Sequence, residues 1–239
     1  MKLLVGLGNP GEKHARHRHN VGYMIADEIA RAYGFESWRS RFQGDMAEGR
    51  LDGVKCLLLK PTTYMNDSGQ SVGEAARYYK IPTEDVIVFH DEIDLQPGKL
   101  RVKTGGGVAG HNGLKSVTAH LGNDYVRVRI GVGHPGRKDL VHRHVLHDFG
   151  SADQAWLEPL MDAIVKDVPL LAADDVPNFM NKIARALQAD AADEPATQAA
   201  AKKPAAKAGQ PSPAADKRDL SEDGPLAAKL KQWLKPKKS

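Results

Sequence analysis

The stretch KLLVGLGNPG, residues 2–11, begins with an apolar run and ends in glycine, asparagine and proline. A short apolar run that is bounded by turn residues indicates a β-strand. Further along, apolar side chains recur at helical spacing over residues 21–33, and Gly34 marks the end of the expected helix. A strand, a turn and an amphipathic helix in this order are typical of an α/β domain.

The same alternation of apolar runs and amphipathic segments continues to about residue 188. The segments MAEGRL and VKCLLLK flank Asp52-Gly53, a dipeptide that favours a β-hairpin, so we expect an antiparallel pair of strands. Helices are expected before the strands DVIVFH and YVRVRIGV, and again at about 152–172 and 176–188. The sequence therefore predicts one globular α/β domain, residues 1–188, with a mixed central sheet flanked by helices.

The composition changes after residue 188. Residues 189–239 are rich in Ala, Pro, Lys and Asp, and such a segment buries too little apolar area to fold alone, so we predict a disordered tail. Ten basic and seven acidic side chains lie there, so the tail holds most of the net charge of +4. Residues 226–235 form an apolar stripe among lysines if they are helical. This segment is either an accessory anchor for RNA, the ribosome or an acidic surface, or part of a solvated, solubilising tail.

Composition also excludes several classes of protein. No apolar run reaches the roughly 18 residues that span a bilayer, and the N-terminus breaks at glycines before a signal-peptide core develops. We expect a soluble, cytoplasmic protein. Cys56 is the single cysteine, which excludes an internal disulfide and a cysteine-rich metal site. A pI near 9.0 permits an anionic partner.

The glycines at residues 6–11, GLGNPG, match the dinucleotide fingerprint G-x-G-x-x-G, with Asp27 downstream. That fingerprint requires a helix that starts within the glycines and an acid at the end of a second parallel strand. Residues 12–19 show no apolar periodicity, and Asp27 lies inside a helical pattern. We therefore interpret the glycines as a tight turn that presents Asn9, and we expect no nucleotide cofactor.

Six blocks of the chain resemble, in order and spacing, the sequence motifs of bacterial peptidyl-tRNA hydrolases. They are GLGNPG at 6–11, RHN at 18–20, TYMN at 63–66, HDEIDL at 90–95, GGG at 105–107 with GHNGLKS at 110–116, and RIGVGHPG at 129–136. The resemblance implies a monomeric α/β enzyme that needs no metal or cofactor. The implied reaction is hydrolysis of the ester between a peptide and the 3′ end of tRNA, which recycles tRNA from aborted translation.

The resemblance implies that His19 is the general base. An imidazole titrates near neutrality, and His19 lies between the glycine turn and the first helix. Asp91 fits the partner that orients such a base, because it follows an apolar strand and α/β sheets place ligands at strand C-termini. The cluster at 90–94 has two other interpretations, a solvated turn or a metal site. Neighbouring strand residues point to opposite faces, which argues against the metal.

Three loop asparagines and a Tyr-Met pair complete the expected pocket. An amide offers a donor and an acceptor without adding charge, which suits recognition of a peptide backbone. By resemblance, Asn9 acts with the catalytic groups and distinguishes a peptidyl group from a free amino acid, while Asn66 and Asn112 bind substrate. Tyr64 and Met65 line the cleft for the terminal nucleotide and the ester, or else they are ordinary packing residues.

Lys103 and Arg129 resemble the family's basic pair that binds a terminal tRNA phosphate. Arg127 and Arg129 alternate with apolar residues in their strand, so they share a polar face. Contact with phosphate explains binding that does not depend on tRNA sequence. The segment 136–149, GRKDLVHRHVLHDF, resembles the family's mobile lid.

The chain departs from the family pattern at three places. His14 stands where the family generally has tyrosine, and we expect its imidazole to keep a contact with the tRNA end. His17 replaces the usual threonine, so His14, His17 and His19 are expected to lower one another's pKa by repulsion. Val108 and Ala109 replace small or polar residues, which leaves the backbone path there open.

Two other function classes fit the sequence less well. An RNA-binding or ribosome-associated protein without catalysis would not need the complete set of His19, Asp91 and the three asparagines. A nucleotide-dependent oxidoreductase would need a helix that begins within the glycine turn. The sequence therefore favours a hydrolase.

Overall fold

The computed structural model describes residues 1–193. The predicted domain boundary at residue 188 falls inside the last helix, which runs to Asp193, and it stays a prediction. The predictions of a disordered tail and of a helix at 226–235 lie outside the described residues. Within the described part of the chain, no helix is long and apolar enough to cross a membrane.

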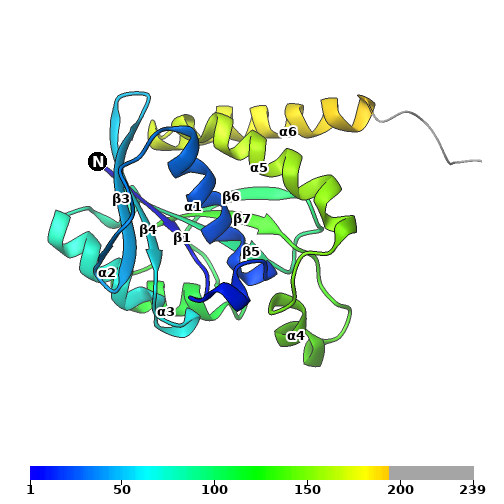
Figure 1. The fold of residues 1–239 in the computed structure, drawn as a ribbon, viewed down its shortest axis with the longest axis horizontal. Helices are drawn as coiled ribbons and strands as arrows, with labels where there is room; N and C mark the ends of the chain where they lie inside the picture. The colour runs from blue at the N-terminus through cyan, green and yellow to red at the C-terminus, as the bar shows by residue number, and fades with distance from the viewer. Residues whose placement is uncertain (194–239) are drawn as a thin grey trace, which may run out of the picture. The chain divides into compact units, whose positions relative to one another are not determined.

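A single seven-stranded sheet forms the centre of the domain (Figure 1). Its order is β2-β3-β4-β1-β5-β7-β6, and β4, β1, β5 and β7 are parallel while the other pairs are antiparallel. The predicted mixed sheet is confirmed. The strands are β1 (Lys2–Gly6), β2 (Arg39–Arg41), β3 (Gly44–Leu51), β4 (Val54–Pro61), β5 (Val86–Glu92), β6 (Leu100–Thr104) and β7 (Val126–Gly131).

Helices cover both faces of this sheet, as the sequence predicts (Figure 1). Ile25 of α1 and Ile164 of α5 belong to the apolar core on one face, and Val72 of α2 and Val117 of α3 belong to the core on the other. The helices are α1 (Val21–Ala32), α2 (Ser68–Tyr79), α3 (Asn112–Leu121), α4 (Val141–Val145), α5 (Ser151–Ala172) and α6 (Val176–Asp193).

The start of α1 lies unusually close to the ends of two strands. A Cβ atom on Gly22 would lie 2.4 Å from the carbonyl oxygen of Phe89, and one on Gly6 would lie 2.2 Å from the carbonyl oxygen of Gly22. Any side chain at these glycines would push the helix away from the sheet. The close approach brings the residues just before α1 to the C-terminal ends of β1 and β5.

The Asp52-Gly53 hairpin is confirmed, since both residues adopt the positive φ of a type I′ turn, 44° and 86°. The sequence did not predict β2, β6 or α4. Strand β2 has three exposed residues, and β6 is a five-residue edge strand with two exposed basic side chains. Short, charged edge strands avoid aggregation, but they carry no apolar run by which sequence patterns find strands.

Candidate active site

A pocket of about 550 Å³ opens at the C-terminal ends of β1 and β5. Because β1 and β5 are parallel neighbours, the residues that follow them meet at one edge of the sheet. The structure brings seven of the predicted site residues together there: Asn9, His19, Tyr64, Met65, Asn66, Asp91 and Asn112. Segments far apart in the sequence thus share one cavity.

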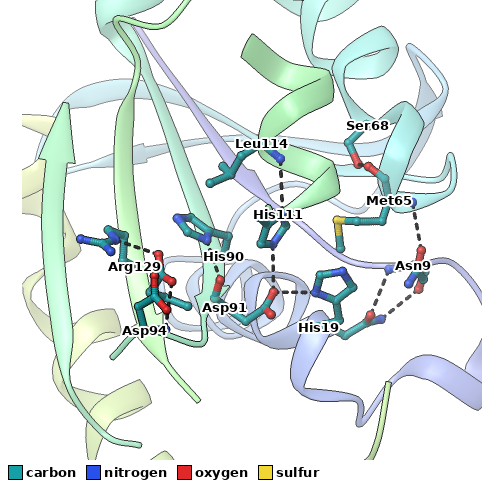
Figure 2. A network of polar contacts seen from close by, with 12 residues as sticks. Asn9, His19, Met65, Ser68, His90, Asp91, Asp94, His111, Leu114 and Arg129 are labelled. Carbon is teal, nitrogen blue, oxygen red and sulfur yellow. Dashed lines mark hydrogen bonds and ion pairs between the residues drawn. The ribbon is translucent and has the colours of Figure 1, made fainter. Parts of the chain in front are cut away.

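At the floor of this pocket, one carboxylate oxygen of Asp91 accepts hydrogen bonds from two imidazoles (Figure 2). The distance from Nδ1 of His19 to Oδ1 of Asp91 is 2.7 Å, and that from Nε2 of His111 is 3.0 Å. Asp91 is 2% exposed, so water does not compete for this oxygen. The pair of His19 and Asp91 has the arrangement of a general base and its orienting acid.

The partners of each ring fix which nitrogen carries the proton. A carboxylate accepts, so Nδ1 of His19 is the protonated nitrogen and its Nε2 keeps a lone pair. His111 donates from Nε2 to Asp91, while its Nδ1 accepts a hydrogen bond from the backbone N–H of Leu114 at 3.3 Å. His111 is therefore also the N-cap of α3.

Burial and charge act in opposite directions on these groups. Burial alone lowers the pKa of the His19 imidazole, but the charge of Asp91 and its hydrogen bond outweigh burial and raise that pKa. Burial likewise favours the neutral form of Asp91, yet His19 and His111 hold the pKa of its carboxyl well below the usual range. Asp91 is therefore ionised at neutral pH and stabilises an imidazolium on His19.

The same three side chains offer suitable ligands for a cation, since the donor atoms of His19, Asp91 and His111 lie within 4.8 Å of one another. All three donor atoms already take part in direct hydrogen bonds, and an ion would have to replace both shared protons. The expectation of a metal-free site stays a prediction.

Asn9 is held from two sides by neighbouring amides. Its backbone N–H donates to Oδ1 of Asn20, and Nδ2 of Asn20 donates to the Asn9 carbonyl, each at 2.9 Å. Oδ1 of Asn9 accepts from the backbone N–H of Met65, also at 2.9 Å (Figure 2). With its oxygen occupied, Asn9 presents its N–H₂ donors to the pocket.

The remaining pocket residues differ in exposure. Tyr64 is 67% exposed, whereas Met65 is 5% exposed, and both line the pocket. Asn66 donates to the carboxylate of Asp67 at 3.0 Å, and Asn112 is the first residue of α3. An exposed aromatic ring suits stacking with a base, and the exposed amides of Asn66 and Asn112 suit a polar backbone.

The predicted lid, residues 136–149, forms one wall of the pocket. It contains α4, and three of its apolar side chains line the cavity: Val141, Val145 and Leu146. At its far end Arg18 donates to the backbone oxygen of Asp148 at 2.9 Å and pairs with Asp153 at 2.7 Å. The end of the lid is thus fixed to the residue that precedes His19.

Lys103 and Arg129 lie outside this pocket. They line a second, small cavity with Arg127 and with Glu92, which also lines the catalytic pocket. Nε of Arg129 donates to Oε2 of Glu92 at 3.0 Å. Because residues 90 and 91 point to opposite faces of β5, the basic pair lies across the strand from Asp91. The structure brings Lys103 and Arg129 together with each other but not with the catalytic residues.

His14 is not among the residues that line the pocket, and its Nδ1 contacts the carbonyl oxygen of Pro10 at 2.7 Å. The expected mutual lowering of histidine pKa values is only partly right. Burial and then the charge of His14 lower the pKa of His17, but the pKa of His19 is raised. Repulsion between the histidines does not lower the pKa of His19, because the charge and the hydrogen bond of the adjacent Asp91 raise it.

Sequence reasoning missed His111 and Asn20. Both occur inside motifs that were recognised, GHNGLKS and RHN, where roles were given only to Asn112 and His19. His111 precedes a helical pattern, and that position is a signal for an N-cap. Ala109, one of the two residues that depart from the family pattern in this loop, adopts a left-handed backbone conformation with φ of 45°.

Comparison with known proteins identifies the family of the chain. Residues 3–192 match the family model described as peptidyl-tRNA hydrolase. A peptidyl-tRNA hydrolase of Bradyrhizobium diazoefficiens is 59% identical over 189 residues, which cover 79% of this chain and 94% of the relative. One from Chelativorans sp. strain BNC1 is 53% identical over 233 residues, covering 97% of this chain and 98% of the relative.

Solved structures agree with the sequence matches. A crystal structure of peptidyl-tRNA hydrolase from Acinetobacter baumannii superposes with a TM-score of 0.73 at 42% identity, and it covers 77% of this chain and 94% of its own. The family match extends over nearly all of the described residues. On this evidence the chain belongs to the peptidyl-tRNA hydrolase family.

Proposed function

We propose that the chain hydrolyses the ester between a peptide, or an N-blocked aminoacyl group, and the 3′ end of tRNA, with His19 as general base. Family membership supports the reaction, and the hydrogen bond of 2.7 Å between His19 and Asp91 supports the role of the base. This hydrogen bond is the observation that carries the mechanism, because it leaves Nε2 of His19 free to accept a proton.

The reaction follows from that tautomer. Nε2 of His19 takes a proton from water as the water oxygen attacks the ester carbonyl, and the resulting imidazolium is stabilised by Asp91. Collapse of the tetrahedral intermediate breaks the bond to the 3′ oxygen of the ribose, which receives the proton from His19. His111 keeps Asp91 ionised and oriented throughout, because it donates to the same oxygen.

The amides of the pocket hold the substrate around this centre. Asn9 donates to the peptide carbonyl beside the ester, and an uncharged donor there favours a blocked amino group over a free ammonium. Asn66 and Asn112 bind the reacting ester and help to hold the oxyanion. Tyr64 and Met65 form the platform for the terminal nucleotide, and His14 adds a contact nearer to the tRNA body.

Lys103 and Arg129 bind a terminal phosphate of the tRNA. They lie on the face of β5 opposite to Asp91, so one tRNA end reaches both sites by passing around the sheet edge. Basic residues beyond residue 193 add an accessory contact with RNA or the ribosome, and the enzyme acts as a monomer.

The decisive experiment is incubation of the purified chain with an N-blocked aminoacyl-tRNA while ester release is followed with and without a chelator. Release that persists in the chelator and disappears in His19→Ala supports a metal-free, histidine-dependent mechanism. Loss of release in the chelator, restored by a divalent ion while the tRNA stays folded, overturns the metal-free mechanism and directs attention to His19, Asp91 and His111 as ligands.

A further inference from the structure

The small cavity beneath the glycine loop 105–107 contains two buried polar atoms that lack a partner. The cavity measures about 50 Å³, and its floor includes His90, 1% exposed, and Arg127, 2% exposed. Among the residues that the structure describes, neither Nε2 of His90 nor Nε of Arg127 has a hydrogen-bond partner. Buried polar atoms are nearly always paired with protein or with ordered water, so this cavity needs an occupant.

The hydrogen bonds of His90 define what the occupant must offer. Nδ1 of His90 lies 2.7 Å from the backbone oxygen of Asp91, and a carbonyl only accepts, so Nδ1 carries the proton. Burial and the nearby His111 lower the pKa of His90 to about 3, which keeps the ring neutral. Nε2 of His90 is therefore an acceptor, while Nε of Arg127 is a donor. An occupant that both accepts and donates is required.

The other contacts of Arg127 show what it holds in place. Its Nη1 donates to the carbonyl oxygens of Gly106 at 3.1 Å and Gly107 at 2.9 Å, and its Nη2 donates to the side chain of Asn123. Arg127 pairs with no carboxylate in the described part of the chain. Its guanidinium thus fixes the glycine loop to β7 and lies 4.6 Å from the centroid of the Tyr125 ring, while its Nε has no partner among the described residues.

We propose that an ordered water occupies this cavity and bridges Nε of Arg127 to Nε2 of His90. The water accepts from Arg127 and donates to His90, and its second proton is directed to Glu92, which lines the same cavity. A buried water needs only about 10–15 Å³ and two to four polar partners, so the cavity provides both requirements.

The bridge gives His90 and Arg127 a positioning role. It joins the glycine loop, held by Arg127, to the backbone of Asp91, held by Nδ1 of His90. Asp91 in turn orients His19. The loop on the basic side of β5 is thereby connected to the catalytic aspartate on the other side, in addition to the direct contact between the rings of His90 and His111, whose centroids lie 5.1 Å apart.

Two amide replacements of His90 separate the halves of the bridge. Glutamine places its oxygen near the position of Nε2 and keeps an acceptor for the water, whereas asparagine reaches only the position of Nδ1 and loses that acceptor.

The experiment measures the free energy of urea unfolding of the full chain for Arg127→Met in three backgrounds: wild type, His90→Gln and His90→Asn. Val117→Ala, which removes buried apolar atoms away from the cavity, is the control background.

We expect Arg127→Met to lower the folding equilibrium constant by roughly tenfold or more in wild type, His90→Gln and Val117→Ala. The factor should shrink severalfold in His90→Asn, because the bridge is already broken there. We also expect kcat on a short N-blocked ester to fall in both His90→Asn and His90→Gln, with KM unchanged, because each replacement breaks one half of the link between the glycine loop and Asp91.

An equal cost of Arg127→Met in all backgrounds overturns the bridge. Because Arg127→Met can fail to fold, a second test uses the wild-type protein. A crystal structure at high resolution should show a water within hydrogen-bond distance of Nε of Arg127 and of Nε2 of His90. Nitrogen NMR should show that His90 is protonated at Nδ1 alone above pH 5. An empty cavity, or protonation of Nε2, contradicts the proposal.

Discussion

The two cavities on either side of β5 are built in opposite ways, although His90 and Asp91 are neighbours in the chain. In the catalytic pocket, the charge of Asp91 is matched by hydrogen bonds from two imidazoles. The basic cavity is lined by three cationic side chains, Lys103, Arg127 and Arg129, and by one carboxylate, that of Glu92. Alternation along a strand lets one element serve both cavities.

The difference predicts two kinds of response to substitution. A matched, buried hydrogen-bond chain orients a proton acceptor, so changes there alter the rate of the chemical step. An excess of positive charge near the surface attracts an anion, so changes there alter binding and its dependence on salt. A variant that changes both the rate of the chemical step and the salt dependence of binding would show that the two cavities are not independent.

The largest effect is expected for His19→Ala. Removing the base should lower kcat by roughly 10²- to 10⁴-fold while tRNA affinity and the fold are retained. Single-turnover hydrolysis of N-blocked aminoacyl-tRNA, together with a binding assay, measures both quantities. His120→Ala, an exposed histidine outside the pocket, is the matched control and should keep wild-type kcat. Near-normal turnover by His19→Ala would remove His19 from the mechanism.

A smaller loss of kcat is expected for Asp91→Asn, with a shift in the pH profile. Asp91 raises the pKa of His19, so removing its negative charge lowers that pKa. The base must be unprotonated to act, and the acidic limb of the profile should therefore move to lower pH. A profile of kcat against pH tests this shift. An acidic limb at the wild-type position would mean that Asp91 does not govern the titration of His19.

In the basic cavity, Lys103→Ala should raise KM for tRNA while leaving kcat nearly unchanged. Loss of one phosphate contact should reduce the slope of log affinity against log salt by about 1. Lys55→Ala is the control, because Lys55 pairs with Glu48 on the hairpin away from this cavity. Identical salt slopes for wild type and Lys103→Ala would locate the phosphate contact elsewhere.

Arg129→Gln, which keeps a donor for Glu92, should behave like Lys103→Ala.

The smallest effect is expected for truncation of the tail. The last helix continues to Asp193, so a cut after residue 193 preserves it, whereas a cut after residue 188 removes its final residues. We expect unchanged turnover on short substrates and modestly weaker binding to full-length tRNA or ribosomes at low salt. Loss of turnover on a minimal substrate would show that the tail belongs to the catalytic domain.

Much of the fold follows from the sequence, because long apolar runs and helical periodicities define β1, β4, β5 and the larger helices. Strand β6, with the sequence LRVKT, could not be found in this way. It exists because it pairs with β7 along its whole length, and that pairing is a tertiary interaction which local pattern does not report.

The candidate site, like the fold, could be predicted from the sequence only in part. His19, Asp91 and the asparagines were predictable from motifs, and the structure places them in one pocket. The contact of His111 with Asp91 was not predictable, since it joins residues on different elements through one oxygen. Arg127 was expected on a polar face, and the structure adds that this face is covered by the carbonyls of the glycine loop.

The attachment of the lid to Arg18 has a consequence for how the pocket opens. The far end of the lid is held by Arg18, and the backbone N–H of Phe149 also donates to the oxygen of Arg16 at 3.0 Å. The near end begins at Gly136, and Gly133 lies just before it, both at positive φ. If this segment opens as the family's lid does, we expect it to stay attached beside the catalytic base and to bend at these glycines. Amide protons of residues 137–146 should exchange with solvent much faster than that of Phe149.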